Sequence, residues 1–219
     1  MSLQHSPSIV TNGLSYYLDA ANIKSYPGSG TTWNDLTGQN SPASLTVAPI
    51  FSANNGGSFV FNGSTTYVTL NLNSTILGLT NNFTNEIWYQ TNNTQANLFY
   101  QRYPGGGYGI QSAGGTSWKA TKYSVIDIFI GSVPQNTNWH QVVYVYSSIN
   151  GVSVYIDGQL NANSNNVTNL STSSTYATLG NAEAGFLNGS ISSIKIYNRE
   201  LNQQEIQQNF NALRGRYGL

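Results

Sequence analysis

Eight acidic residues supply all the side-chain carboxylates of this 219-residue chain, and they are the first candidates for chemistry. Glycoside hydrolysis requires two carboxyl groups held about 5–10 Å apart. Trp88 and Gln90 occupy the next two same-face positions after Glu86, so one carboxylate stands where two are needed. Asp127 would have to approach Glu86 from another strand, and nothing in the sequence brings the two together. We therefore expect Glu86 to bond a neighbouring tyrosine, lysine or backbone group, with hydrolysis by a cryptic acid pair as an alternative.

Nucleophilic catalysis has less support still. The chain has no cysteine and no Gly-x-Ser-x-Gly sequence, and its two histidines, His5 and His140, lie far apart in the sequence. His140 follows Trp139 within a predicted strand. That position is more typical of a packed, hydrogen-bonded histidine than of a catalytic base or a metal ligand.

Aromatic side chains beside glycine-rich turns offer a different chemistry, the binding of sugars. A sugar needs an aromatic face for the C–H side of its ring and amide, carboxylate or backbone groups for its hydroxyls. The chain has 15 tyrosines and 4 tryptophans in an asparagine-rich background. Binding residues tend to lie at loop tips, and the candidates there are Tyr100, Tyr103, Tyr108 and Trp118. The alternative for each tyrosine is a structural role, because tyrosine is also a good strand residue.

The elements that would position these residues are mostly short strands. Residues 139–160 predict a hairpin, in which Asn150-Gly151 forms the turn because both residue types tolerate positive φ. Its first strand is apolar or aromatic on both faces, which predicts cover on both sides. Asn62-Gly63 predicts a second hairpin. We expect Trp33 to anchor the long loop 20–44, and a slip in the apolar spacing of the last strand, 191–197, predicts a bulge.

One helix is predicted, over residues 202–214. Asn202 is the expected N-cap, and Glu205 three residues later completes a capping box. Gly215 is the expected C′ residue. The apolar face has the spacing i, i+4, i+7 and consists of Ile206, Phe210 and Leu213.

Several of these segments resemble a known family. W-H-x-V, a strand and then Y-I-D-G, within residues 139–158, resemble the signature of concanavalin A-like jelly rolls of the laminin G and pentraxin type. G-L-S-Y-Y-L-D-A (13–20), S-F-V-F-N-G-S-T-T-Y-V (58–68) and N-G-S-I-S-S-I-K-I-Y-N-R-E-L (188–201) resemble it in the expected order. The opening segment (13–20) and the closing segment E-I-Q-Q-N-F-N-A-L-R-G-R-Y-G-L (205–219) together resemble the version found in structural proteins of tailed bacteriophages.

The resemblance implies a fold and a set of candidate sites. The fold would be all-β, a sandwich of two antiparallel sheets with one short C-terminal helix, in a single domain over 1–219 with a disordered lead over 1–8. Glucanase relatives carry the acids E-x-D-x-E along one strand, and this chain has only the first of them, at Glu86. Laminin G-like relatives often bind calcium through loop oxygen atoms. The candidates for such a site are Asp19, Asn22 and Asp35, although Asp19 and Asp35 have an alternative role in holding the loop through hydrogen bonds.

Composition excludes several classes of function. The formal net charge is zero and only 7% of residues are charged. Nucleic-acid binding needs clustered lysine and arginine, so we expect neither nucleic acid nor an anionic membrane as a partner. No window is apolar enough to span a bilayer, and no signal peptide is recognised. The absence of cysteine excludes disulfides and cysteine-bound zinc.

These observations predict a non-enzymatic binding module that recognises carbohydrate. The resemblance places it on a phage virion surface, as a capsid decoration or a fibre component, or more broadly in an extracellular setting. Its partners would be a cell-surface glycan and other virion proteins, with homo-oligomerisation left open. The alternatives are a purely structural, cementing virion protein that binds protein rather than sugar, and a glycan hydrolase.

Overall fold

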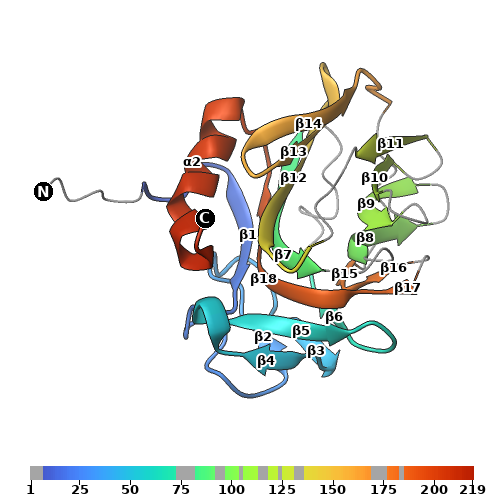
Figure 1. The fold of residues 1–219 in the computed structure, drawn as a ribbon. Helices are drawn as coiled ribbons and strands as arrows, with labels where there is room; N and C mark the ends of the chain where they lie inside the picture. Colours follow the sequence, from blue (N-terminus) through green and yellow to red (C-terminus); the bar gives the residue numbers. More distant parts are fainter. Residues whose placement is uncertain are drawn as a thin grey trace, which may run out of the picture.

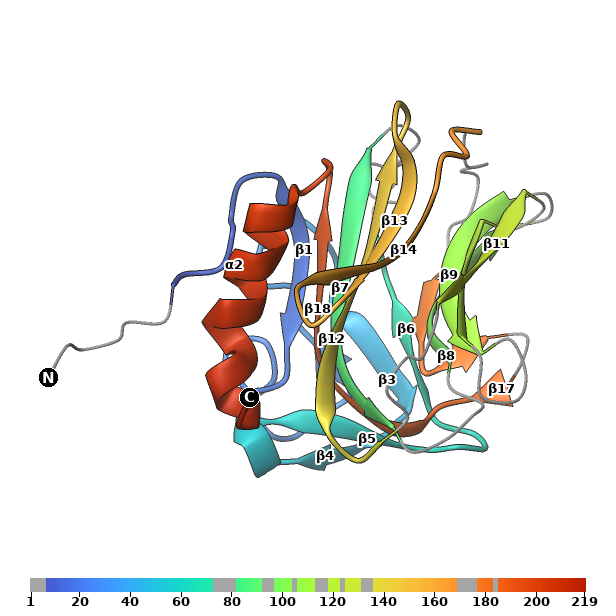
Figure 2. The ribbon, with the colours of Figure 1, turned by 45° about the horizontal axis from the view of Figure 1, so that its top comes forward.

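The chain folds as a β-sandwich. The computed structural model describes residues 7–72, 82–91, 97–103, 106–112, 118–122, 125–130, 136–168, 177–182 and 185–219. Two eight-stranded antiparallel sheets face each other, and helix α2 (Gln203–Leu213) lies on the outside of the first, sheet A (Figures 1 and 2). The predicted all-β architecture with one C-terminal helix is confirmed. Most of the predicted lead, residues 1–6, lies outside the described residues.

Sheet A is centred on the longest strand, β18 (Asn188–Tyr197). Along one edge β18 pairs with β7, and along the other it pairs first with β5 and then with β1. Its register shifts between Ile191 and Ser193, where the second edge passes from β5 to β1, so the predicted bulge is confirmed. The other strands of the sheet are β14 (Gln159–Ser164), β13 (Gly151–Ile156), β12 (Trp139–Ser147), β7 (Phe83–Thr91), β5 (Ser58–Asn62), β4 (Ile50–Ser52) and β1 (Leu14–Asp19).

Sheet B contains a meander of four consecutive strands and four strands from elsewhere in the chain. Its spatial order is β11 (Ile126–Ile130), β10 (Trp118–Lys122), β9 (Gly106–Ser112), β8 (Asn97–Tyr103), β15 (Ala177–Leu179), β6 (Tyr67–Leu70), β3 (Ala43–Val47) and β2 (Thr32–Trp33). A separate small hairpin, β16 (Asn181–Ala182) and β17 (Gly185–Phe186), lies against β8.

The core between the sheets is apolar and aromatic. Trp33 is fully buried in it and packs edge-on against Phe59, with ring centroids 4.7 Å apart, so the predicted anchor of the first loop is confirmed. Strand β12 is buried along its whole length, as predicted. Its consecutive residues Val142 and Val143 face the core and the helix respectively, because successive side chains of a strand point to opposite faces.

Two predicted turns differ in detail. In the β12–β13 hairpin Ser147 pairs with Gly151, so the loop has three residues, and only Gly151 has positive φ (+85°). The predicted hairpin at Asn62-Gly63 is wrong, because β5 belongs to sheet A and β6 to sheet B. The turn itself forms: the Asn62 side-chain oxygen accepts hydrogen bonds from the backbone N–H groups of the three residues that follow Gly63. A turn signal predicts that the chain changes direction and does not predict which sheet receives it.

Helix α2 begins as predicted and ends differently. Asn202 and Glu205 form the complete capping box. The predicted C′ role of Gly215 is wrong, because the chain continues as a 3-10 helix, η2 (Arg214–Tyr217), and the left-handed residue is Gly218 (φ +76°). The continuation carries Tyr217 onto Trp88, where the rings stack with centroids 4.3 Å apart. Burying the Tyr217 ring stabilises the fold more than ending the helix at Gly215 would.

A buried polar network holds α2 to sheet A. Glu86 on β7 and Lys195 on β18 are directly opposite each other, fully buried, with Nζ and Oε1 2.7 Å apart. Asn209 on α2 donates from Nδ2 to the other Glu86 oxygen, Oε2, at 2.7 Å. Glu86 is therefore a strand carboxylate bonded to a lysine, which is one of the roles expected for it.

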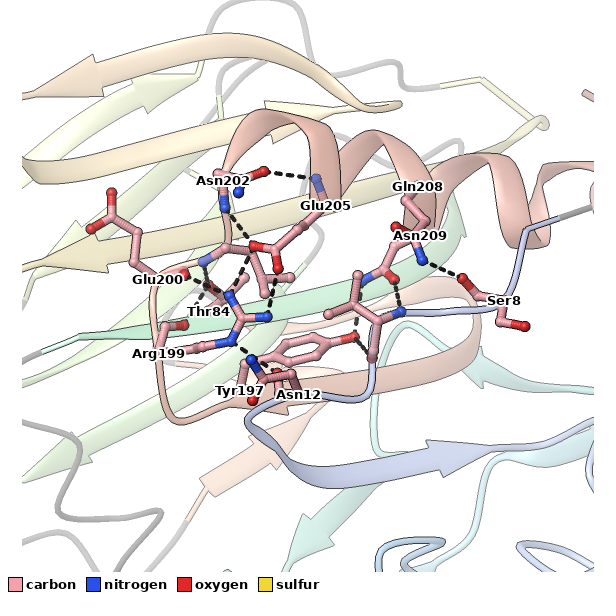
Figure 3. A network of polar contacts seen from close by, with 12 residues as sticks. Ser8, Asn12, Thr84, Tyr197, Arg199, Glu200, Asn202, Glu205, Gln208 and Asn209 are labelled. Atoms are coloured by element: carbon pink, nitrogen blue, oxygen red, sulfur yellow. Dashed lines mark hydrogen bonds and ion pairs between the residues drawn. The ribbon is translucent and has the colours of Figure 1, made fainter.

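The same asparagine also ties down the N-terminal segment. Its Oδ1 accepts the Val10 N–H at 2.7 Å, and its Nδ2 donates to the Tyr197 hydroxyl at 2.9 Å (Figure 3). Burial, and next the charge of Glu86, raise the pKa of Tyr197. The hydroxyl thus stays protonated and donates a hydrogen bond to the Val10 carbonyl at 3.0 Å.

We predict that Lys195→Met destabilises the fold strongly. Removing one partner of a buried pair leaves an uncompensated charge and typically costs about 3–5 kcal/mol. The free energy of unfolding in urea measures the loss, and adding Glu86→Gln should recover part of it. Lys119→Met is the matched control, because the Lys119–Asp127 pair is partly exposed and should lose no more than about 1 kcal/mol. Similar losses in both variants would contradict the assigned importance of the buried pair.

We also predict a pH-dependent contribution from the helix cap. Arg199 donates two hydrogen bonds to Glu205, at 2.8 and 2.7 Å (Figure 3). These bonds lower the pKa of Glu205 below its ordinary value of 4.5, so its stabilisation is present above pH 4.5 and is lost as the pH falls through the lower folded value. Glu205→Gln should cost about 0.5–1 kcal/mol of unfolding free energy at about pH 7 and almost nothing at about pH 3. An equal difference at both pH values would contradict this.

Candidate functional site

A row of outward-facing residues crosses all eight strands of sheet B. Each member lies opposite the next in the strand register, and the chain neighbours of these residues include core side chains such as Phe99, Ile110 and Ala120. The row, from β2 to β11, consists of Thr32, Ser44, Thr69, Thr178, Tyr100, Gly109, Thr121 and Asp127. We call this set the polar row, since every side chain in it can form hydrogen bonds.

The centre of the polar row is little exposed. Thr178 and Thr121 are only 1% and 2% exposed although they point away from the core, whereas Thr32 at the sheet edge is exposed. The β16–β17 hairpin lies beside this part of the row. Thr178 donates to the Asn181 carbonyl at 2.8 Å, and the Asn97 side chain donates to the Gly185 carbonyl at 2.6 Å.

Tyr100 lies in the middle of the polar row and is partly exposed. Directly opposite it is Gly109, so on that side the tyrosine ring has backbone instead of a side chain as its cross-strand neighbour. Asn97 lies next to it on the same outer face, and its Oδ1 atom is buried with no hydrogen-bond partner among the described residues. Unpaired buried acceptors are rare and costly, which makes this oxygen a candidate ligand contact.

The β11 end of the row has one negative and one positive side chain, Asp127 and Lys119, which form an ion pair. Asp127 accepts a hydrogen bond from Lys119 at 2.8 Å and another from the Thr121 hydroxyl. Partial burial opposes ionisation of Asp127, but the bonds from Lys119 and Thr121 outweigh it and the net pKa is lowered. The carboxylate is therefore ionised and paired at neutral pH. Among the described side chains, the polar row and its neighbours combine an aromatic face, hydroxyls, an amide and one paired cation and anion.

Comparison with known sequences places the fold in a family. Residues 62–207 match a laminin G-type family described as the concanavalin A-like lectin/glucanases superfamily. The chain belongs to this superfamily. No curated protein matches the full sequence.

Solved structures show the same fold in proteins of low sequence identity. Domain 4 of an extracellular arabinanase from Geobacillus stearothermophilus, in complex with arabinotriose, has a TM-score of 0.69 at 18% identity, over 90% of this chain and 97% of that one. The binding domain of Paraclostridial Mosquitocidal Protein 1 has 0.70 at 16%, over 91% of this chain and 52% of that one. Trypanosoma rangeli sialidase in complex with sialic acid has 0.69 at 17%, and this chain, 95% covered, spans 36% of its length.

The four aromatic residues predicted to bind sugar have different positions in this concanavalin A-like domain. Tyr100 lies in the polar row and is partly exposed. Tyr108 is a core residue, 3% exposed and stacked on Phe99 with ring centroids 4.8 Å apart, so its prediction as a binding residue is wrong. Its parity with Ile110 along β9 is the signal that would have placed it inside. The side chains of Tyr103 and Trp118 lie outside the described part of the structure.

Asp35 holds the first loop. Its carboxylate accepts five hydrogen bonds, from the Tyr17 N–H and from backbone and side-chain groups of Thr37 and Asn40. This is the turn-capping alternative expected from the sequence. All five hydrogen-bond donors belong to the protein itself.

Asp19 is bound to the C-terminal segment. Arg216 donates to its Oδ1 at 2.7 Å, and the Tyr17 hydroxyl donates to its Oδ2 at 2.8 Å. The third predicted ligand, Asn22, accepts the Lys24 N–H. As they are arranged, a guanidinium and N–H or O–H donors already occupy these oxygens. They do not fit a calcium ion, and no cluster of three or more histidine or acidic residues occurs among the described residues.

The structure keeps Asp127 and Glu86 apart, so these two do not form the acid pair that the alternative of a glycan hydrolase needs. Glu86 faces α2 on the outer side of sheet A, and Asp127 lies on the outer side of sheet B. The core of the sandwich separates them, so they share no cleft. His140 is a packed, hydrogen-bonded histidine, as predicted. No helix in the described ranges is long and apolar enough to cross a membrane.

We predict that the first loop is held by Asp35 without calcium. Asp35→Ala should lower the unfolding free energy by about 1–3 kcal/mol, because several donors lose their partner. The loss should be equal with excess calcium chloride and with EDTA. Thermal unfolding tests this, since an ion that binds the folded state would raise the wild-type Tm. A calcium-dependent rise that Asp35→Ala removes would contradict the assignment.

Proposed function

We propose that this domain is a non-enzymatic carbohydrate-binding module and that its ligand lies across the polar row at Tyr100. The observation that carries the proposal is one partly exposed aromatic ring in a row of hydroxyl-bearing residues, beside the unpaired Asn97 oxygen. The apolar face of a sugar ring would stack on Tyr100. Its hydroxyls would bond the Asn97 oxygen and the threonine side chains beside it.

A neutral glycan suits this surface better than an acidic one. Lys119, the described cation beside the polar row, is paired with Asp127 on the neighbouring strand. Polar uncharged groups occupy the rest of the row. The arabinanase domain with the same fold is described in complex with arabinotriose, a neutral oligosaccharide, which supports the same class of ligand here.

Binding without hydrolysis is favoured by the state of the acids. Glu86 is buried in an ion pair and Asp127 is held by Lys119 and Thr121. Neither is placed to act on a ligand with the other as its partner. The proposed mechanism is shallow recognition, with weak single-site affinity that several copies on one particle or polymer would raise.

A structural, cementing role has less support. Such a role would need an extended apolar patch. The exposed large apolar residues of the described chain are scattered, and Ile50 and Val60, 74% and 38% exposed, are the only cross-strand pair among them. A place on a phage virion stays a prediction from the sequence resemblance, because the arabinanase, the toxin and the sialidase are not described as virion proteins.

We predict that Tyr100→Ala lowers the affinity for a bound neutral glycan by about tenfold, the scale of an aromatic contact. A glycan array that includes arabino-oligosaccharides identifies the ligand, and calorimetry measures the change. Tyr100→Phe should keep most of the affinity, because the stacking face remains. Tyr155→Ala is the control, since Tyr155 is a partly buried tyrosine on the other sheet.

Two results would overturn the proposal. One is an array without any binding by the wild-type chain. The other is release of reducing ends from a bound polysaccharide, which would indicate hydrolysis in place of binding. Equal losses in Tyr100→Ala and Tyr155→Ala would move the site away from the polar row.

A further inference from the structure

A shallow pocket lies at the rim of the sandwich, apart from the polar row. It has a volume of about 210 Å³ and is lined by Gln90, Thr91, Thr137 and Gly189. These residues come from the end of β7, the start of β18 and the turn before β12. Gly189 must lack a side chain, because a Cβ atom there would lie 2.3 Å from the Gln90 carbonyl oxygen. Of the described residues that line it, none carries a charge.

The wall of this pocket is held by a short turn, residues 136–138. The Gln90 side-chain amide donates to the Thr137 carbonyl, so the turn and the end of β7 are joined directly. Asn136 Oδ1 accepts the Asn138 N–H at 2.8 Å. Because this atom accepts a backbone hydrogen bond, it is the oxygen and not the nitrogen of the amide.

His140 contacts an acceptor at each ring nitrogen. Its Nδ1 lies 2.7 Å from Asp157 Oδ2, and its Nε2 lies 3.1 Å from Asn136 Oδ1. The Asp157 carboxylate is fixed in turn, since its Oδ1 accepts the Gln141 N–H at 2.8 Å. A neutral imidazole has one N–H group and an imidazolium has two. Both contacts are hydrogen bonds only when His140 is doubly protonated.

We propose that the rim pocket is a second binding site, for a single sugar-sized neutral polyol, and that protonated His140 holds its wall in the binding conformation. Loss of one proton turns the contact with Asn136 into a repulsion between lone pairs and releases the 136–138 turn. Thr137 and the amide of Gln90 then lose their fixed positions. The choice of ligand class rests on the proposed carbohydrate-binding function, whereas the protonation argument does not.

The charge of His140 depends on the titratable groups packed around it. Asp157, in the turn after β13, and Tyr89 on β7, with its ring 6.1 Å from the imidazole, are the titratable groups that the described residues place against it. Burial raises the pKa of Tyr89 well above its ordinary value, and the charge of Asp157 adds to this, so Tyr89 stays neutral.

One chain segment links the surroundings of the two sites. The Gly185 carbonyl accepts a hydrogen bond from Asn97 beside the polar row, and Gly189 lines the rim pocket. Four residues of fully extended chain span at most about 14 Å, so Gly185 and Gly189 lie no farther apart than that.

Nuclear magnetic resonance of the full, ¹⁵N-labelled chain tests the switch without any ligand. The backbone amide of Asn138 and the side-chain amide of Gln90 should shift in step with the His140 ring signals between about pH 5 and pH 8. His5→Ala should leave this titration unchanged. Amide signals that ignore the His140 titration, or that follow it only in the presence of His5, would overturn the assigned role of His140.

Methyl glycosides of arabinose, glucose and galactose then test the pocket at about pH 5 and about pH 8. Gln90, Thr137 and Gly189 signals should respond to the sugar, with affinity about threefold to tenfold weaker at the higher pH, the effect of one lost hydrogen bond. His140→Gln should remove the pH dependence, and Tyr100→Ala should leave these three responses in place. Responses confined to the polar row would overturn the second site and leave the proposed function standing, whereas no response at either place would contradict both.

Discussion

The buried ion pair between Glu86 and Lys195 is the constraint on which the rest of this structure depends. Removing two charges from water costs several kcal/mol for each ion, and the cost is offset only if every remaining donor and acceptor finds a partner. Asn209 supplies the partner for the second Glu86 oxygen, and its other contacts reach Tyr197 and Val10. One polar cluster thereby joins the two central strands of sheet A, the helix and the N-terminal segment, elements that are far apart in the sequence.

This cluster decides which surfaces are left for a ligand. Next to it, Trp88 stacks against Phe210 and Tyr217, so the helix and its 3-10 extension cover the middle of the outer face of sheet A (Figure 2), whereas Ile50 and Val60 at its β4–β5 edge stay exposed. The space between the sheets is filled by the aromatic core. The polar row and the rim pocket lie away from both, on the outer face of sheet B and at the rim. A ligand at either of these places would leave the packing that holds the fold together undisturbed.

The superfamily name covers both lectins and glucanases, and the fold by itself does not decide between them. The positions of the carboxylates bear on the choice. In this chain the strand acid Glu86 serves stability, and Asp35 and Asp19 hold the first loop and the C-terminal segment. Because these acids have structural roles, the polar, uncharged groups of sheet B are the surface that we propose for a ligand.

The sequence by itself determined the local features: the alternating strands, the burial of Trp33, the bulge in the last strand and the capping box at Asn202. Each of these depends on neighbouring residues, through backbone preference or the period-two exposure of side chains. Tertiary structure alone decided that the chain after Asn62 enters the other sheet, that Glu86 is paired with Lys195, and that His140 lies between Asp157 and Asn136. These contacts join residues from separate strands and turns, and their energies depend on burial and register, which no local pattern carries. Tyr108 is the exception, because its alternation with Ile110 already indicated the core and only its nearness to a glycine-rich turn suggested a ligand.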